Sequence, residues 1–255
     1  MKQESGFEIL DLGLRDYQEV LDLQLAKLEE IKARRDSGES PGTLILCSHP
    51  PIVTLGRKSF PEDLQGWTGP ITEIARGGRA TYHGPSQLVL YPIVDLSHIR
   101  LKKQRDLSWY LTALEDSVIS ALFHFGLKSE GRSQKRFQQS EESGDPEKSV
   151  VSNPSETGVW VSVTDTSHDK GALNGARKIA SLGIGIRDWI TYHGVALNLD
   201  FDPAAFQGIN PCGFSPSVMI DVETLRGGKV DRVQFSRYWL AAFQKELLRE
   251  DSSDS

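Results

Sequence analysis

The chain has 255 residues, of which 38% are hydrophobic and 25% are charged, a balance typical of a soluble globular protein with a sizeable core. Its net charge of −6 argues against broad nucleic-acid binding, and it has no run of about 18 apolar residues that would span a membrane. Because two cysteines make no disulfide framework, a reducing cytoplasm is the predicted location.

The first predicted helix covers about residues 16–35, where apolar residues recur at helical spacing and basic residues suit the C-terminal end. Residues 43–47 form an apolar run that predicts a buried strand, and the prolines at 50 and 51 stop it. Residues 52–55 are predicted to form a short extended segment.

A loop rich in polar groups follows between two apparent strands, residues 71–75 and 88–94. Residues 76–87 read Arg-Gly-Gly-Arg-Ala-Thr-Tyr-His-Gly-Pro-Ser-Gln, which is longer and chemically richer than a hairpin turn requires. Glycines let the backbone approach a ligand, and arginines hold carboxylates or phosphates. We therefore expect a functional loop, and the alternative is a surface loop with incidental charge.

The second predicted helix starts after Asp106, an N-cap residue, and ends at Gly126. Residues 128–157 are rich in Ser, Glu, Gln, Gly and Pro, so we predict a flexible insertion that buries little surface. Residues 165–174 are expected to form a second polar loop. Between the two loops, residues 159–163 alternate like a strand.

The best hairpin candidate consists of residues 178–187 and 190–199, with a turn near Asp188. Residues 203–216 are irregular, and glycines at 227 and 228 suggest a turn.

Apolar spacing from Val233 to Leu247 predicts the last helix, and residues 251–255 should form a disordered tail. Long strand-rich runs between a few helices predict an α+β fold, with one mixed β-sheet and helices packed on it. We expect a single domain over residues 1–250.

Two residues in the C-terminal third of the chain stand out as candidates for chemistry, Cys212 and Lys178. Cys212 lies between Pro211 and Gly213, so the thiol can be exposed on a sharp turn. Lys178 opens a strand of small residues, and a lysine beside a thiol can lower the thiol pKa or accept its proton. The alternative interpretations are a buried, inert cysteine and a lysine whose charged end reaches solvent.

His83 and His193 are alternative bases, because each lies in a Tyr-His-Gly triplet, and a Cys–His hydrolase is therefore a second interpretation. No Cys-x-x-Cys or His-Glu-x-x-His pattern is present, so we expect no metal. The sequence has neither a Walker phosphate loop nor a Gly-x-Gly-x-x-Gly motif after a strand. No cofactor is therefore predicted.

Five stretches together resemble the octanoyl (lipoyl) transferases of protein lipoylation, in the order typical of that family and over most of residues 7–225. They are His-Pro-Pro-Ile-Val-Thr-Leu-Gly-Arg (49–57), the loop at 76–87, Lys-Ile-Ala-Ser-Leu-Gly (178–183), Tyr-His-Gly-Val-Ala-Leu-Asn (192–198) and Asn-Pro-Cys-Gly (210–213). One stretch alone would be suggestive, whereas five in order are highly specific.

The resemblance implies the catalytic fold shared with biotin and lipoate protein ligases. It implies transfer of an octanoyl group from octanoyl-acyl carrier protein to a lysine of the lipoyl domains of 2-oxoacid dehydrogenases or of the glycine cleavage H protein. The family's nucleophile falls on Cys212 and its lysine partner on Lys178. The family's acyl-binding segments fall on Arg76, Gly77, Gly78, Arg79, Ala80, Thr81, Tyr82, His83, Ser181, Leu182, Gly183, Gly194, Val195 and Ala196.

Two features depart from the family pattern. Ser86 stands where the family usually has glycine, and its side chain could narrow the pocket or shift the local backbone. The insertion over residues 128–157 is longer than usual. Two further alternatives are an ATP-dependent lipoate ligase on the same fold, which would not need Cys212, and a non-catalytic module that binds acyl chains or a carrier protein.

Overall fold

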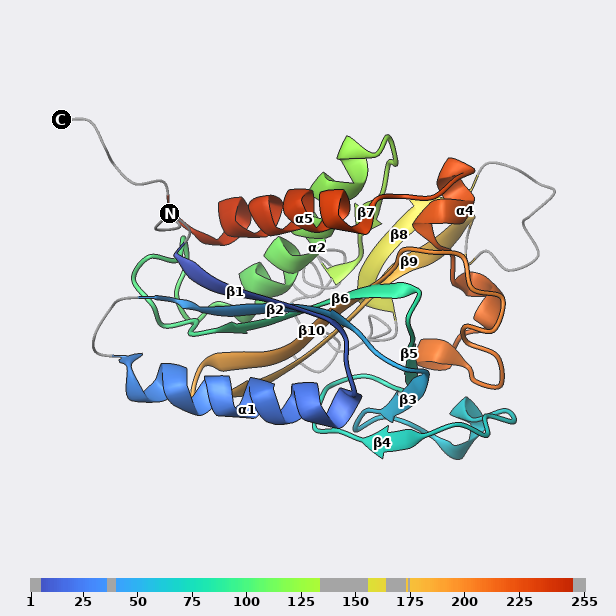
Figure 1. Cartoon of the computed structure of the whole chain (residues 1–255), viewed down its shortest axis with the longest axis horizontal. Helices are drawn as coiled ribbons and strands as arrows, with labels where there is room; N and C mark the ends of the chain where they lie inside the picture. Colours follow the sequence, from blue (N-terminus) through green and yellow to red (C-terminus); the bar gives the residue numbers. More distant parts are fainter. Residues whose placement is uncertain (1–5, 36–39, 134–155, 164–172, 174, 250–255) are drawn as a thin grey trace, which may run out of the picture.

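A seven-stranded β-sheet lies between one long helix on one face and two helices on the other (Figure 1). The structure is a computed structural model that describes residues 6–35, 40–133, 156–163, 173 and 175–249. In sheet order the strands are β1 (Phe7–Leu14), β2 (Gly42–Ser48), β6 (Gln87–Val94), β10 (Ile190–Asn198), β9 (Ala176–Arg187), β8 (Gly158–Ser162) and β7 (Glu130–Gly131). Strands β1 and β2 pair in parallel, and every other neighbouring pair is antiparallel.

Three long helices cover this sheet, and each begins after an aspartate. They are α1 (Tyr17–Ala33), α2 (Leu107–His124) and α5 (Arg232–Leu247). The carboxylates of Asp16, Asp106 and Asp231 accept hydrogen bonds from backbone N–H groups of the first turn, which satisfies donors that have no partner within the helix. The three predicted helices are thus confirmed.

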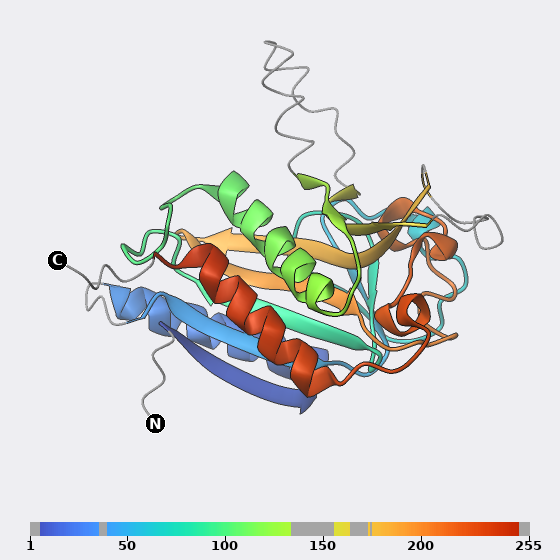
Figure 2. The same cartoon turned by 90° about the horizontal axis from the view of Figure 1, so that it is seen from above.

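The two faces of the sheet are buried by different helices (Figure 2). Val20 and Leu28 of α1 pack against Ile45 and Val89 on one face, while α2 and α5 pack on the other. Strand β10 is buried along its whole length because it lies between both layers. Within the described residues, no helix combines the length and hydrophobicity needed to cross a lipid bilayer.

The predicted hairpin is confirmed as strands β9 and β10. Its turn residues, Asp188 and Trp189, have φ angles of 52° and 64°, and two positive φ angles are what a tight type I′ hairpin turn requires. The hairpin register brings residues 181–183 of β9 directly opposite residues 194–196 of β10. These are two of the segments that the family resemblance singled out.

The predicted α+β fold, with a mixed β-sheet and helices packed on it, is confirmed, but the structure also has a second, three-stranded sheet that was not predicted. Its central strand is β3 (Ile52–Leu55), which pairs in parallel with β4 (Ile71–Glu73) and antiparallel with β5 (Thr81–His83). The predicted loop at 76–87 therefore contains a strand at its centre. That strand forms by pairing with β3, which lies about 30 residues earlier in the chain. A local sequence pattern does not reveal such a pairing.

Besides β5, two strands and one α-helix have no counterpart among the sequence predictions. Strand β1 is an edge strand that pairs only with β2, and its burial does not alternate regularly. Helix α4 (Val222–Arg226) is a short turn that ends at Gly227, whose φ is 70°. Strand β7 lies within the predicted insertion, and residues 134–155 of that insertion lie outside the described residues, as do 164–172, 174 and the tail.

Candidate active site

Cys212 lies on a sharp 3₁₀ turn, Pro211–Gly213, as its proline and glycine neighbours predicted. Its φ of 56° is in the left-handed region that side chains rarely adopt. The turn is held from the neighbouring loop, because the backbone N–H of Cys212 donates to the carbonyl of Ala80 at 2.8 Å. The thiol is half-buried, so it is reachable and its direction is determined by the backbone.

Lys178 of β9 contacts this thiol, with its Nζ atom 3.8 Å from the Sγ atom of Cys212. The lysine side chain is 1% exposed, which rules out a charged end that reaches solvent. The lysine side chain fits because residue 158 is glycine: a Cβ atom at that position would lie only 2.7 Å from the lysine Cε. The Nζ atom also lies 5.5 Å from the ring centroid of Trp160, a favourable distance for a cation over an aromatic face.

Burial lowers the pKa of Lys178, and the Cys212 thiolate and the carboxylates of Glu115 and Glu156 oppose that shift. Glu115 is itself buried, and its carboxylate accepts hydrogen bonds from the backbone of Ser133 and Gly158. A lysine that loses its proton more readily than usual is suited to exchange one with a thiol or an amine.

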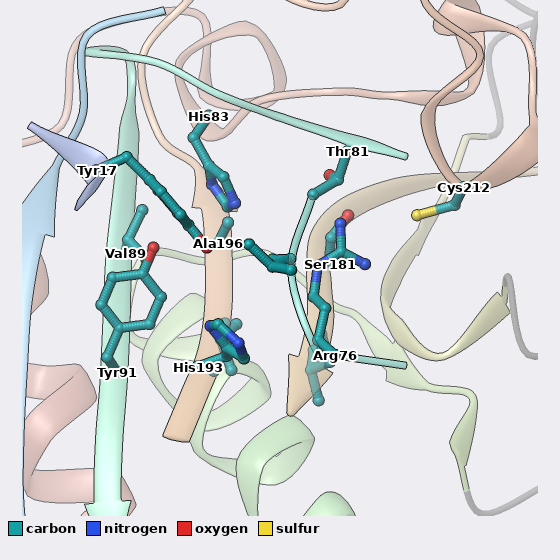
Figure 3. A pocket seen from close by; sticks show the side chains of 15 residues that line it. Tyr17, Arg76, Thr81, His83, Val89, Tyr91, Ser181, His193, Ala196 and Cys212 are labelled. Carbon is teal, nitrogen blue, oxygen red and sulfur yellow. The ribbon is translucent and has the colours of Figure 1, made fainter. Parts of the chain in front are cut away.

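Cys212 lies at one end of a pocket and points its sulfur toward the other lining side chains (Figure 3). The hairpin contributes the middle of the wall through Ser181, Gly183, Gly194 and Ala196, which are small residues. Gly183 is paired with Gly194 and Ser181 with Ala196 across the two strands. Ser181 and Ala196 leave room that larger side chains would fill, whereas a Cβ atom on Gly194 would overlap the carbonyl of Leu90.

Aromatic and imidazole side chains close the end of the pocket away from Cys212 (Figure 3). The rings of Tyr17 and His83 stack with centroids 5.7 Å apart, and Tyr91 and His193 lie beside them. Burial lowers the pKa of His193 to about 4 and holds the pKa of His83 well below its usual range. Both imidazoles are therefore neutral at pH 7.

His193 has an unusual environment within this group. Its φ is 59°, its side chain is 3% exposed, and neither ring nitrogen has a hydrogen-bond partner among the described residues. Its backbone N–H donates to the buried amide oxygen of Gln24 on α1 at 2.7 Å. This bond fixes the backbone of β10 where it passes the pocket.

The two arginines of the loop at 76–87, which are predicted to hold a ligand, both have partners within the protein. Arg76 is buried and donates to the carbonyl and hydroxyl oxygens of Thr54 at 3.1 and 2.9 Å. Its Cδ atom lies against Gly183, where a Cβ would approach it to 2.9 Å. Arg79 pairs with the buried carboxylate of Asp63. The glycine at 183 thus makes room for an arginine.

The structure brings most of the predicted site residues together. The predicted residues that line the pocket are Arg76, Thr81, His83, Ser181, Leu182, Gly183, Gly194, Val195, Ala196 and Cys212. Gly77, Gly78, Arg79, Ala80 and Tyr82 lie outside the lining, and the Tyr82 ring packs instead against Trp67 and Phe206. Sequence reasoning missed the lining residues Tyr17, Ile74, Val89 and Tyr91, which look like ordinary core positions of a helix and strands.

The pocket is narrow as it stands. Its cavity volume is about 30 Å³. The side chain of Arg76 lies across Gly183 and takes up part of the space along the hairpin.

The second cysteine, Cys47, is in a different setting. It is fully enclosed in β2, its sulfur lies 3.5 Å from Nε2 of His49, and burial raises the pKa of its thiol to about 12. Such a thiol is inert at neutral pH.

In the part of the chain that the structure describes, no three His, Cys, Asp or Glu side chains are grouped so that they could hold a metal ion.

A family model for the lipoyl protein ligase A/B catalytic domain matches residues 16–244. The octanoyltransferase of Bdellovibrio bacteriovorus is 41% identical over 227 residues, which cover 88% of this chain and 91% of that protein. The octanoyltransferase of Syntrophotalea carbinolica is 34% identical over 240 residues and covers 94% of both chains.

Solved structures with a similar fold include a bipartite lipoate protein ligase with its E2 lipoyl domain from Thermoplasma acidophilum. It superposes with a TM-score of 0.59 at 14% identity, over 96% of this chain and 86% of that one. A lipoate-protein ligase A bound with ATP superposes with a TM-score of 0.54 at 15% identity, over 96% and 87%. The expected lipoate ligase catalytic fold is confirmed.

Proposed function

Because the chain belongs to the octanoyltransferase family, we propose that it transfers an octanoyl group from acyl carrier protein to a lysine of a lipoyl domain, through a thioester on Cys212. That it is an acyltransferase follows from the family itself. The donor, the intermediate and the acceptor are the parts that the proposal adds.

The observation that carries the proposal is the contact between Lys178 and Cys212, 3.8 Å apart at one end of the pocket. Only a thiolate is a good nucleophile, and a neighbouring cation favours it. An ammonium group with a lowered pKa also gives up its proton more easily than a surface lysine. The pair can therefore serve as nucleophile and proton carrier.

In the first half of the reaction, the Cys212 thiolate attacks the carbonyl carbon of the carrier thioester. A new S–C bond forms on Cys212, the carrier C–S bond breaks, and the carrier thiolate takes a proton from Lys178. One thioester replaces another, so the step needs no ATP to activate the acyl group.

In the second half, the acceptor amine attacks the thioester on Cys212. A C–N bond forms, the Cys212 thiolate leaves, and neutral Lys178 takes the proton that the amine loses. The lipoyl domains of 2-oxoacid dehydrogenases and the glycine cleavage H protein are the proposed acceptors. The Thermoplasma ligase of similar fold is described together with an E2 lipoyl domain, which supports this choice.

The acyl tail would lie along the small residues of the hairpin, between Cys212 and the rings at the inner end. Burying about seven methylene groups at about 0.8 kcal/mol each contributes roughly 5 kcal/mol before the cost of binding. This favours octanoyl over acetyl strongly, whereas a chain one carbon longer or shorter differs only modestly.

The deciding experiment mixes the protein with octanoyl-acyl carrier protein, without ATP, and measures intact mass. We expect the mass of one octanoyl group on the wild type and none on Cys212→Ser, and transfer of that mass to an added lipoyl domain. A mass gain that survives in Cys212→Ser would contradict the intermediate. Transfer that requires free acid and ATP would indicate a ligase, and release of free octanoate would indicate a hydrolase.

A further inference from the structure

The turn that carries Cys212 rests on a segment far from it in the sequence, residues 60–67. The backbone N–H of Asn210 donates to the carbonyl of Asp63 at 2.8 Å, and its side-chain amide donates to the carbonyl of Glu62 at 3.1 Å. The backbone N–H of Gln65 donates to the carbonyl of Gly208 at 2.7 Å. Residues 208–210, which lead into the cysteine turn, are thus bonded to residues 62–65.

Asp63 is the centre of that support. It is 0% exposed, and its carboxylate accepts the backbone N–H of Phe60 at 3.0 Å. The same carboxylate accepts the Nε–H of Arg79 at 3.0 Å and also pairs with the Nη2 atom of that guanidinium. A two-point pairing of this kind fixes the plane of the guanidinium as well as its position.

The guanidinium held by Asp63 lies directly against the cysteine turn. A Cβ atom on Gly213 would overlap the Nη1 and Cζ atoms of Arg79, and the φ of Gly213 is 81°. The guanidinium lies 5.0 Å from the ring centroid of Phe60. Arg79 therefore fills the space next to Gly213, where a side chain would otherwise be, and leaves the turn little room to relax.

The backbone of the same loop then holds Cys212 itself. Ala80 follows Arg79, and its carbonyl accepts the N–H of Cys212 at 2.8 Å. Cys212 has a φ of 56°, a conformation that persists only where surrounding structure enforces it. The enforcing contacts are the Ala80 carbonyl at Cys212 and the paired arginine at Gly213.

We infer that Asp63 and Arg79 are positioning residues for the reaction, which together hold the Cys212 turn so that its sulfur points into the pocket. The inference rests on the proposed role of Cys212 as nucleophile. Neither residue lines the pocket, so each acts through the turn and not through the substrate. Arg79 would then hold the cysteine turn, whereas the family resemblance implies that it binds the acyl group.

The test compares Asp63→Asn, Arg79→Met and the double variant with the wild type. The first keeps the shape of the side chain and removes its charge, and the second keeps the aliphatic stem and removes the guanidinium. The matched control is Asp95→Asn, because Asp95 is equally buried and pairs with Arg35 at 2.7 Å beside the hairpin turn. The single-turnover rate of Cys212 acylation by octanoyl-acyl carrier protein is measured together with thermal unfolding.

We expect both single variants to acylate about 10- to 100-fold more slowly than the wild type while folded, since a displacement of about 1 Å can slow a reaction about 100-fold. The double variant should be no slower than the slower single variant, because the two residues act as one unit. The Michaelis constant for the carrier thioester should change little, and Asp95→Asn should acylate at the wild-type rate.

The outcomes separate this inference from the proposed function. Acylation of folded Asp63→Asn and Arg79→Met at the wild-type rate would overturn the inference alone. Slower acylation that merely follows the loss of folded protein would also overturn it, because the role would then be structural. A wild type that gains no octanoyl mass on Cys212 would refute the proposed function, and the inference with it.

Discussion

The Nζ atom of Lys178 lies 3.8 Å from the Sγ atom of Cys212, although the two residues are 34 positions apart in the sequence. The lysine comes from a buried position of β9 and the cysteine from a 3₁₀ turn that is bonded to the loop at Ala80. Each of the two depends on a glycine, because Gly158 gives space to the lysine stem and Gly213 gives space to Arg79 beside the cysteine.

Replacing Lys178 should separate its effect on the thiol from its effect on the fold. We expect Lys178→Met to remain folded, to make the Cys212 thiol less reactive at neutral pH and to slow acyl transfer by about 100-fold or more, the usual range for a lost acid–base group. Iodoacetamide alkylation of Cys212 as a function of pH measures the first effect. Lys229→Met, at an exposed position, is the control; an identical alkylation profile in Lys178→Met would contradict the role in thiol ionisation.

Filling the middle of the pocket should shorten the preferred acyl chain. Ala196 lines the pocket and is 4% exposed, so Ala196→Leu should block an octanoyl tail while a butyryl group still reaches Cys212. We expect octanoyl transfer to fall at least about tenfold and a stability cost of about 1–3 kcal/mol from overpacking. Rates across carrier thioesters of four to ten carbons test this, with Ala204→Leu at an exposed turn as the control. An unchanged chain-length profile would place the tail elsewhere.

Acid should destabilise the protein through the buried imidazole of His193. Its folded-state pKa of about 4 lies below the unfolded value of about 6.5, so its contribution is fully present above pH 6.5 and is lost as pH falls toward 4. Between pH 7.5 and 4.5 this one group should remove about 2 to 3 kcal/mol of unfolding free energy.

The measurement for His193 is urea unfolding at the two pH values in the wild type and in His193→Asn, since asparagine tolerates the positive φ. On acidification, His193→Asn should lose about 2 to 3 kcal/mol less unfolding free energy than the wild type. The difference reports His193 alone, because His83 and all other groups remain in both proteins. His124→Asn, at an exposed site, should behave like the wild type. Equal acid sensitivity of His193→Asn and the wild type would refute the assignment.

The departure from the family at Ser86 should matter little for transfer. Of the two effects considered for its side chain, narrowing of the pocket is not seen, because Ser86 lies outside the lining and its hydroxyl donates to Asp202 at 3.3 Å. Its φ is not positive, so the backbone there does not need glycine. We expect Ser86→Gly to keep kcat/KM within about twofold and to lower stability by about 0.5–1 kcal/mol. A large gain in kcat/KM would show that the serine hinders the reaction.

Local features were predictable from the sequence because each depends on neighbours within a few residues. The N-cap at Asp106, the periodic helices, the β9–β10 hairpin and the sharp turn at Cys212 are of this kind. The order of five short motifs was enough to indicate the octanoyltransferase family. Motif order can be read directly from the sequence, whereas contacts between distant residues cannot.

Only the tertiary structure decided which of these features meet. The pairing of β3 with β5, the contact of Arg79 with Asp63 and the ring of Tyr17 against His83 each join segments at least 16 residues apart. Such contacts arise when the sheet and its helices bury a shared core, and no repeat within one segment encodes them. For the same physical reason, the sequence did not reveal that Arg76 and Arg79 of this loop contact Thr54 and Asp63.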